Sequence, residues 1–193
     1  MVRGLGYRCV KTSFVVPDDL DPLQRHPKAA GPGQPIRMHS PACLGCGEAA
    51  PRGLHLVVRA ATDDEFAVET VMPVEQWMEG GPGVIHGGVL STAFDEVMSV
   101  APLLVGPSAV TVHLETDFIA PITVGTTLHL RARLLGRQRR KLYVEASAHL
   151  GDPDALVAVG HSIFVTVDAK AHFADHVENS AIGDEHKARL SRP

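Results

Sequence analysis

Residues 89–101 read Val-Leu-Ser-Thr-Ala-Phe-Asp-Glu-Val-Met-Ser-Val-Ala, and this stretch decides the fold. Its apolar residues recur at steps of three and four, the spacing of an α-helix, and Pro102 ends the pattern. They cover most of the helix circumference, which predicts that the helix is buried against another layer. No other long segment carries this period, so we expect a single central helix.

The chain that follows this helix alternates between apolar and polar residues, which is the period of a β-strand. Turn-forming residues separate four such runs, at 110–118, 128–134, 142–150 and 157–167. Two shorter runs before the helix, 54–60 and 66–72, predict a hairpin. Short connections between alternating strands favour antiparallel pairing. The predicted class is α+β: a curved antiparallel sheet of five or six strands wrapped around one long central helix.

The 193 residues have the size of one domain, and both ends differ from the middle in composition. Residues 1–35 contain the Pro/Gly-rich stretch 27–35 and are interpreted as an N-terminal arm and linker. Residues 169–193 are rich in histidine and charge and are interpreted as a polar C-terminal tail. The regular patterns fall in residues 36–168, which we take as the folded domain.

Charge and hydropathy exclude several classes of protein. The net charge of −4 argues against a general nucleic-acid binder, because contacts to phosphates require an excess of lysine and arginine. No apolar run approaches the roughly 20 residues that a membrane span needs, and no apolar segment follows the basic residues Arg3, Arg8 and Lys11. We therefore expect a soluble, cytoplasmic protein without a bound cofactor.

The chain has three cysteines, an odd number in a domain large enough to be stable without disulfides. Cys43 and Cys46 have the C-x-x-C spacing, and His39 is near them in sequence, so a zinc site is conceivable. No second pair of ligands completes a set of four, and Cys9 is distant in sequence. The sequence therefore favours free thiols, and no metal site is predicted.

The loop before the central helix ends in His86, Gly87 and Gly88. The N–H groups of a first helical turn have no partner within the helix, and the helix dipole there favours negative charge. Such donors suit an oxyanion hole, while a flexible entry turn is the plainer interpretation of the same glycines.

Two carboxylates follow within the helix, at Asp95 and Glu96. An interior helix has little reason to carry them, and we expect Asp95 to be the functional one and Glu96 to lie on the solvated strip. Thr111 opens the next predicted strand, where threonine is also simply a good β-former.

These residues together carry a resemblance. The segment 80–88 has the pattern Gly-x-Pro-Gly-x-x-His-Gly-Gly, a carboxylate follows nine residues after the histidine, and the strand 110–118 leads to Ala120 and Pro121. The pattern resembles hotdog-fold thioesterases of the PaaI and THEM4-like kind, over roughly residues 40–168. The segments 43–47 and 51–56 also resemble the opening of such domains.

The resemblance implies an acyl-CoA thioesterase that works as a homodimer, with each active site at the subunit interface, and leaves a homotetramer as the alternative assembly. The N–H of Gly87, alone or together with that of Gly88, is then expected to bind the thioester oxygen, and His86 to orient the loop or touch the substrate. Asp95 from the other subunit is expected to act as general base or nucleophile, with Thr111 holding it or the water.

A basic run lies between two of the predicted strands, at residues 137–141. Arg139 and Arg140 are candidates for binding the phosphates of CoA, although a solvated hairpin turn is equally compatible with them. Low aromatic content, 5%, tilts the expected acyl group toward aliphatic chains of medium or long length. A non-catalytic acyl-CoA-binding module and a dehydratase acting on acyl thioesters remain as alternatives.

Overall fold

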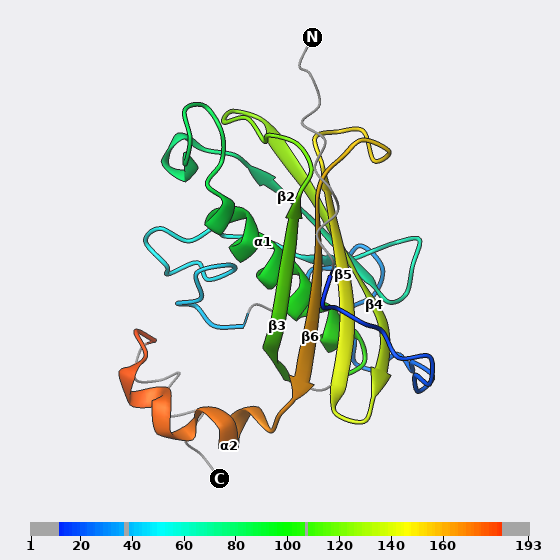
Figure 1. Ribbon diagram of the computed structural model, residues 1–193. Coiled ribbons are helices and arrows are strands. Elements are labelled where there is room, and N and C mark those ends of the chain that lie inside the picture. Colours follow the sequence, from blue (N-terminus) through cyan, green and yellow to red (C-terminus); the bar gives the residue numbers. More distant parts are fainter. Residues whose placement is uncertain (1–11, 37–38, 107, 183–193) are drawn as a thin grey trace.

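The computed structural model describes residues 12–36, 39–106 and 108–182. Six antiparallel strands form one curved sheet in the order β1-β2-β4-β5-β6-β3, and the helix α1, Gly87–Val100, lies in its concave face (Figure 1). The strands are β1 Arg59–Ala60, β2 Ala67–Pro73, β3 Ala109–Phe118, β4 Thr127–Gln138, β5 Lys141–His149 and β6 Leu156–Thr166. The predicted fold class is confirmed, with six strands.

The core forms where α1 packs on the sheet, as the period of its apolar residues predicted. Leu90, Phe94 and Met98 are completely buried. Phe94 lies so close to β6 that a Cβ at Gly160 would come within 3.1 Å of its ring. The helix therefore sits directly on a patch of small residues, and a larger side chain at Gly160 would push it away from the sheet.

This close approach explains a difference in β6. The sequence pattern groups the apolar odd-numbered residues of the run 157–167, but the even-numbered Ala158, Ser162 and Phe164 are the fully buried ones that face α1. The odd face lies on the outer side of the sheet, where Phe14 stacks on His161 with ring centroids 4.9 Å apart. Part of the N-terminal arm thus covers an apolar outer surface.

The rest of the described arm also lies against the domain. Asp21 N–H donates to Arg137 O at 2.7 Å, and Gly33 N–H donates to Ala60 O at 2.8 Å. The stretch interpreted as a linker therefore runs alongside β1.

Only two residues of the predicted strand 54–60 pair within the sheet. The alternation itself is real, because Leu54, Leu56 and Val58 are buried. Their backbone groups bond elsewhere: Leu54 N–H donates to Leu44 O, and Leu56 N–H donates to Gly45 O. This arrangement fixes the segment after Ser40 against the domain.

The C-terminal segment forms a short helix, α2 Ala169–Phe173, followed by a 3-10 helix at Ala174–Asn179. Val177 and Ile182 are buried, so this part of the predicted tail packs on the protein. Within the described residues, no helix has the length and hydropathy to cross a membrane.

Candidate active site

The loop before α1 is held in place on both sides. His86 N–H donates to Met78 O at 2.7 Å, and Ile85 N–H donates to Ile122 O at 2.9 Å. His86 is the N-cap of α1, and its ring nitrogen Nδ1 accepts a hydrogen bond from Gly88 N–H at 2.9 Å. The histidine thus fixes the loop that starts the helix.

This cap gives the N–H groups of Gly87 and Gly88 different roles, although the sequence analysis considered them together. The N–H of Gly88 is engaged by His86 and is not available as a second oxyanion donor, which corrects the expectation for Gly88. The N–H of Gly87 has no partner among the described residues, and it sits at the positive end of the helix dipole. Gly87 is therefore the free donor of this turn.

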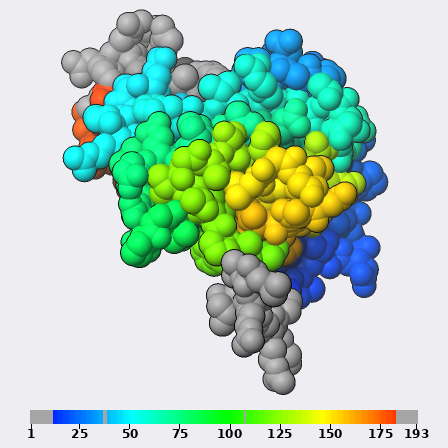
Figure 2. Space-filling view, turned by 90° about the horizontal axis from the view of Figure 1, so that it is seen from above, coloured from blue at the N-terminus to red at the C-terminus, as the bar shows by residue number. Residues whose placement is uncertain are grey.

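An apolar pocket opens beside Gly87, at the end of the molecule where α1 begins. It is lined by Val84, Ile85, Gly87, Leu90, Phe118, Ile119, Ala120, Pro121 and Ile122. Figure 2 shows the loops around residues 80–90, 118–126 and 150–155 side by side at this end. A carbonyl bound to Gly87 N–H would thus have apolar surface next to it.

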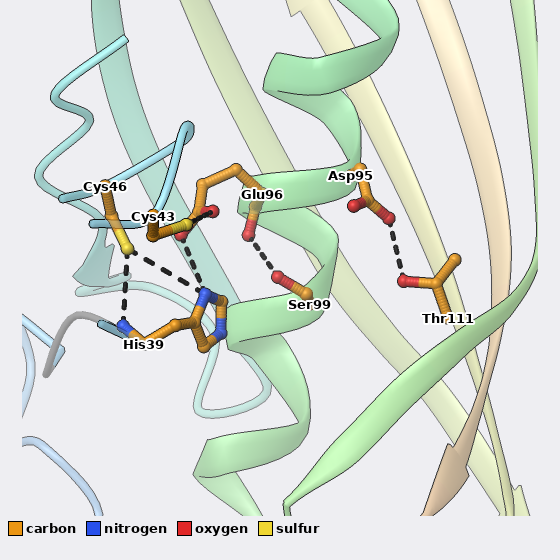
Figure 3. Close-up of polar contacts among 7 residues, drawn as sticks. All are labelled: His39, Cys43, Cys46, Asp95, Glu96, Ser99 and Thr111. Carbon is orange, nitrogen blue, oxygen red and sulfur yellow. Dashed lines mark hydrogen bonds and ion pairs between the residues drawn. The ribbon is translucent and has the colours of Figure 1, made fainter. Parts of the chain in front are cut away.

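Asp95 lies half-buried on the side of α1 that faces β3. Thr111 Oγ1 donates a hydrogen bond to its Oδ1 at 2.8 Å, and Figure 3 shows the two side chains pointing toward each other. The hydroxyl fixes one carboxylate oxygen of Asp95, and no hydrogen bond to Oδ2 is found within the described part of the chain. The predicted pair is brought together.

A β-bulge makes this contact possible. The register of β3 against β6 shifts between Thr111 and His113, so Val112 is an extra residue. Without the bulge, Thr111 and Thr116 would lie on opposite faces of the strand, because they are five residues apart. With it, both face α1: Thr111 contacts Asp95, and Thr116 contacts Ser91 at 3.2 Å.

Within one copy of the chain, Gly87 and Asp95 are too far apart to act on the same carbonyl. They are eight residues apart on α1, which is about 12 Å along the helix axis at 1.5 Å per residue. Gly87 lies near the end of β3, where Phe118 packs against it. Asp95 lies near the start of β3, where Thr111 binds it.

The basic turn between β4 and β5 lies at the other end of the sheet from Gly87 (Figure 1). The Arg140 guanidinium donates to Thr166 O, and Arg139 N–H donates to Asp21 at 3.3 Å. Arg139 and Arg140 are thus near the start of β3 and remote from the Gly87 of their own copy.

Glu96, the other carboxylate of α1, is not exposed as the sequence predicted. Glu96 is only 5% exposed, so it does not lie on a solvated strip. Its side chain points away from Asp95, toward the loop that carries His39, Cys43 and Cys46 (Figure 3).

Hydrogen bonding in this cluster changes the protonation of its members. Cys46 and then His39 lower the pKa of Cys43, and the Cys43 sulfur and then Glu96 raise the pKa of His39 to about 10. The same contact with Cys43, followed by burial, raises the pKa of Cys46. Sequence analysis grouped His39 with the C-x-x-C pair but placed Glu96 on a solvated strip, so it found only three ligands and predicted no metal site. Counting His39, the two cysteines and Glu96 as one set of four would have found it.

A family model described as the thioesterase superfamily matches residues 82–157, which run from the loop before α1 into β6. Over these residues the chain is similar to the thioesterase superfamily, and its curved antiparallel sheet around one helix is the hotdog fold.

Two acyl-coenzyme A thioesterases are similar to the hotdog domain in sequence. Human THEM5 is 30% identical over 89 residues, which are 46% of this chain and 36% of the relative. Bovine THEM4 is 23% identical over 92 residues, 48% of this chain and 38% of the relative. The matches thus span little more than a third of these relatives' length.

Solved structures are similar to the hotdog domain as well. A thioesterase superfamily protein superposes with a TM-score of 0.60 at 22% identity, covering 64% of this chain and 60% of that one. A phenylacetic acid degradation-related protein from Ralstonia eutropha superposes with a TM-score of 0.53 at 25% identity, covering 61% of this chain and 89% of that one. The first of these supports the fold alone.

Proposed function

We propose that this protein is an acyl-CoA thioesterase that hydrolyses the thioester to a free acid and CoA. The observation that carries the proposal is the placement of two complementary groups near the two ends of β3. Gly87 offers a free N–H for an oxyanion, and Asp95 offers a carboxylate held by Thr111. The acyl-CoA thioesterases THEM5 and THEM4, similar in sequence to the domain, support the same class of reaction.

The two groups form one site if two copies pair along β3. This strand is at the edge of the sheet, is ten residues long, and carries Val112 at 57% and Phe118 at 50% exposure. A long, apolar, unpaired edge is a template for pairing with another strand. In a two-fold antiparallel pair centred between Leu114 and Glu115, Thr111 of one copy lies opposite Phe118 of the other.

Asp95 of one copy then approaches the Gly87 of the other. The carbonyl oxygen of the thioester accepts a hydrogen bond from Gly87 N–H, which stabilises the negative charge that develops during attack. Asp95 either deprotonates the attacking water or attacks the carbonyl carbon itself. Both routes need the carboxylate in the same place, and Thr111 holds it there.

The same pairing places the arginine turn. Arg139 and Arg140 of one copy lie near the start of β3, and in the pair this end comes beside the Gly87 loop of the other copy. Their guanidinium groups suit the phosphates of CoA. The apolar pocket beside Gly87 suits an aliphatic acyl chain of medium or long length.

The role of His86 argues against the dehydratase alternative. A dehydratase at this position would use a histidine as the base at the acyl α-carbon. Here the Nδ1 of His86 accepts from Gly88 N–H and caps α1. The carboxylate at Asp95, by contrast, faces the strand along which the copies pair.

Release of free CoA thiol from acyl-CoAs of graded chain length tests the proposal, with the native protein compared to Asp95→Asn. We expect turnover with a chain-length optimum, lost in the variant. If the native protein binds these acyl-CoAs without releasing thiol, the chain is a binding module and the proposal fails.

A further inference from the structure

Among the described residues, one group of metal-ligating side chains comes together, and it lies outside the proposed active site. One ligand atom each from His39, Cys43, Cys46 and Glu96 lies within 4.8 Å of all the others. Three come from the loop before residue 47, and the fourth comes from α1, more than 40 residues later. Figure 3 shows the loop side chains converging on Glu96.

The backbone of the loop is built around this convergence. Gly47 N–H donates to Cys43 O at 2.8 Å, which closes a tight turn around the C-x-x-C pair. A Cβ at Gly45 would collide with the carboxylate of Glu96, and a Cβ at Gly47 would collide with the backbone of Pro41 and Cys43. Both positions therefore require glycine for the two sulfurs to reach Glu96.

We propose that His39, Cys43, Cys46 and Glu96 bind a zinc ion. With Zn–S bonds of about 2.3 Å and Zn–N or Zn–O bonds of about 2.0–2.1 Å, a tetrahedral site has ligand–ligand distances of about 3.3–3.8 Å. Here Cys46 Sγ is 3.8 Å from His39 Nδ1, Cys43 Sγ is 3.3 Å from Glu96 Oε2, and His39 Nδ1 is 3.1 Å from Glu96 Oε1. These three contacts are thus close to the spacing of a tetrahedral site, and one ligand atom from each residue lies within 4.8 Å of all the others.

Burial of Glu96 points to a cation. Its side chain is 95% buried, and its Oε1 is paired with His39 Nδ1 at 3.1 Å but has no hydrogen bond of good geometry in the described part of the chain. A buried carboxylate is costly unless it is fully paired, and a metal bond lowers that cost. Two thiolates, one carboxylate and one neutral imidazole carry a total charge of −3, and a divalent ion reduces it to −1 while two protons of the metal-free cluster leave to solvent.

The ligand set identifies the class of ion and its role. Two soft sulfurs with an imidazole in a tetrahedral arrangement select zinc over magnesium or calcium, which prefer oxygen ligands. Four protein ligands leave no open position for substrate, so the ion is structural. It fastens the loop 39–47 to the face of α1 opposite Asp95.

Metal content and metal titration of the full-length protein test the site. We expect the protein purified without chelator to contain one zinc per chain. After the metal is stripped, titration with Co²⁺ alone is expected to give the charge-transfer and intense visible bands of a tetrahedral thiolate site. We expect Cys43→Ser and Glu96→Gln to weaken zinc binding by more than about 100-fold, beyond the effect of losing an outer-shell partner.

Two variants serve as controls. Cys9→Ser removes the remaining cysteine, which is outside the described residues, and Asp95→Asn removes the neighbouring carboxylate of α1. Both are expected to keep the zinc and the cobalt spectrum. Circular dichroism checks that each variant folds. If Cys43→Ser does not fold, the test rests on Glu96→Gln. Absence of stoichiometric zinc, or binding unchanged in Glu96→Gln, would overturn the proposal.

Discussion

Two neighbouring carboxylates on α1 have opposite surroundings. Asp95 faces β3, is half-exposed and accepts a hydrogen bond from Thr111. Glu96 faces the 39–47 loop and is buried against two cysteines and a histidine. Successive helical residues point about 100° apart, so adjacent positions can serve separate sites. An accessible carboxylate on an edge suits chemistry, and an enclosed one suits a bound ion.

The largest expected effect is on kcat, and it comes from the Asp95 face of α1 alone. Asp95→Asn keeps the shape of the side chain but removes its charge, so we expect kcat to fall by about 10²–10⁴-fold, the usual contribution of a general acid or base. The zinc content and the unfolding midpoint are expected to remain those of the native protein.

Glu96→Gln is the matched variant on the other face. Because it loses the ion, we expect a lower unfolding midpoint by roughly 10 °C at saturating zinc, as a lost ligand worth about 4 kcal/mol implies for a domain of this size. Differential scanning fluorimetry with and without chelator measures it. If both variants lose the same property, the two faces do not serve separate sites.

Disrupting the β3 edge tests whether the site on the Asp95 face needs a second copy while the site on the Glu96 face does not. Val112→Lys places a charge on the exposed bulge of the edge strand, which opposes pairing with a second copy. We expect the protein to sediment as a monomer and to lose thioesterase activity in proportion, with its zinc retained. A monomeric variant with full activity would refute the shared site.

A smaller effect is expected at Thr111. Thr111→Val removes the hydroxyl that orients Asp95, and a hydrogen bond to a charged group worth about 1.5 kcal/mol corresponds to a loss of about tenfold in kcat. Thr116→Val is the matched control, because Thr116 faces the same helix but contacts Ser91. Equal losses in the two variants would mean that Thr111 acts only through packing.

The fold could be predicted from the sequence because the periods that indicate its helix and strands lie within short stretches of the chain. The helix period at 89–101 and the alternation in the four later runs set the layers, and each run forms a strand in the structure, although in β6 the other face packs on α1. Where prediction failed, a neighbour distant in sequence was responsible. Nothing near Val112 in the sequence shows that the register with β6 shifts there, although the bulge places Thr111 beside Asp95.

Glu96 illustrates the same limit. Its burial depends on a loop more than 40 residues earlier, and helix periodicity carries no information about which face a distant loop covers. The function of Gly88 depended similarly on where the His86 ring turns, which spacing does not determine. Arg139 and Arg140 depend on the second copy, which no single chain specifies.

The central claim is that each active site combines Gly87 of one copy with Asp95 of another, and subunit complementation tests it most directly. Gly87→Pro removes the donor N–H. Proline suits the first helical position after the extended His86, and the Phe118 ring, which a Cβ would approach to 3.1 Å, must shift by a few tenths of an ångström. Asp95→Asn removes the carboxylate. Each variant alone is expected to be inactive, and each site of a mixed dimer carries either both defects or neither.

Equal amounts of the two variants, exchanged to equilibrium, are therefore expected to regain about a quarter of the native activity, since half the dimers are mixed and half their sites are intact. Thiol release from an acyl-CoA, measured before and after subunit exchange, gives this value. Activity that stays at background while mixed dimers form would contradict the shared site. It would mean that Gly87 and Asp95 act within one chain or take no part in the reaction.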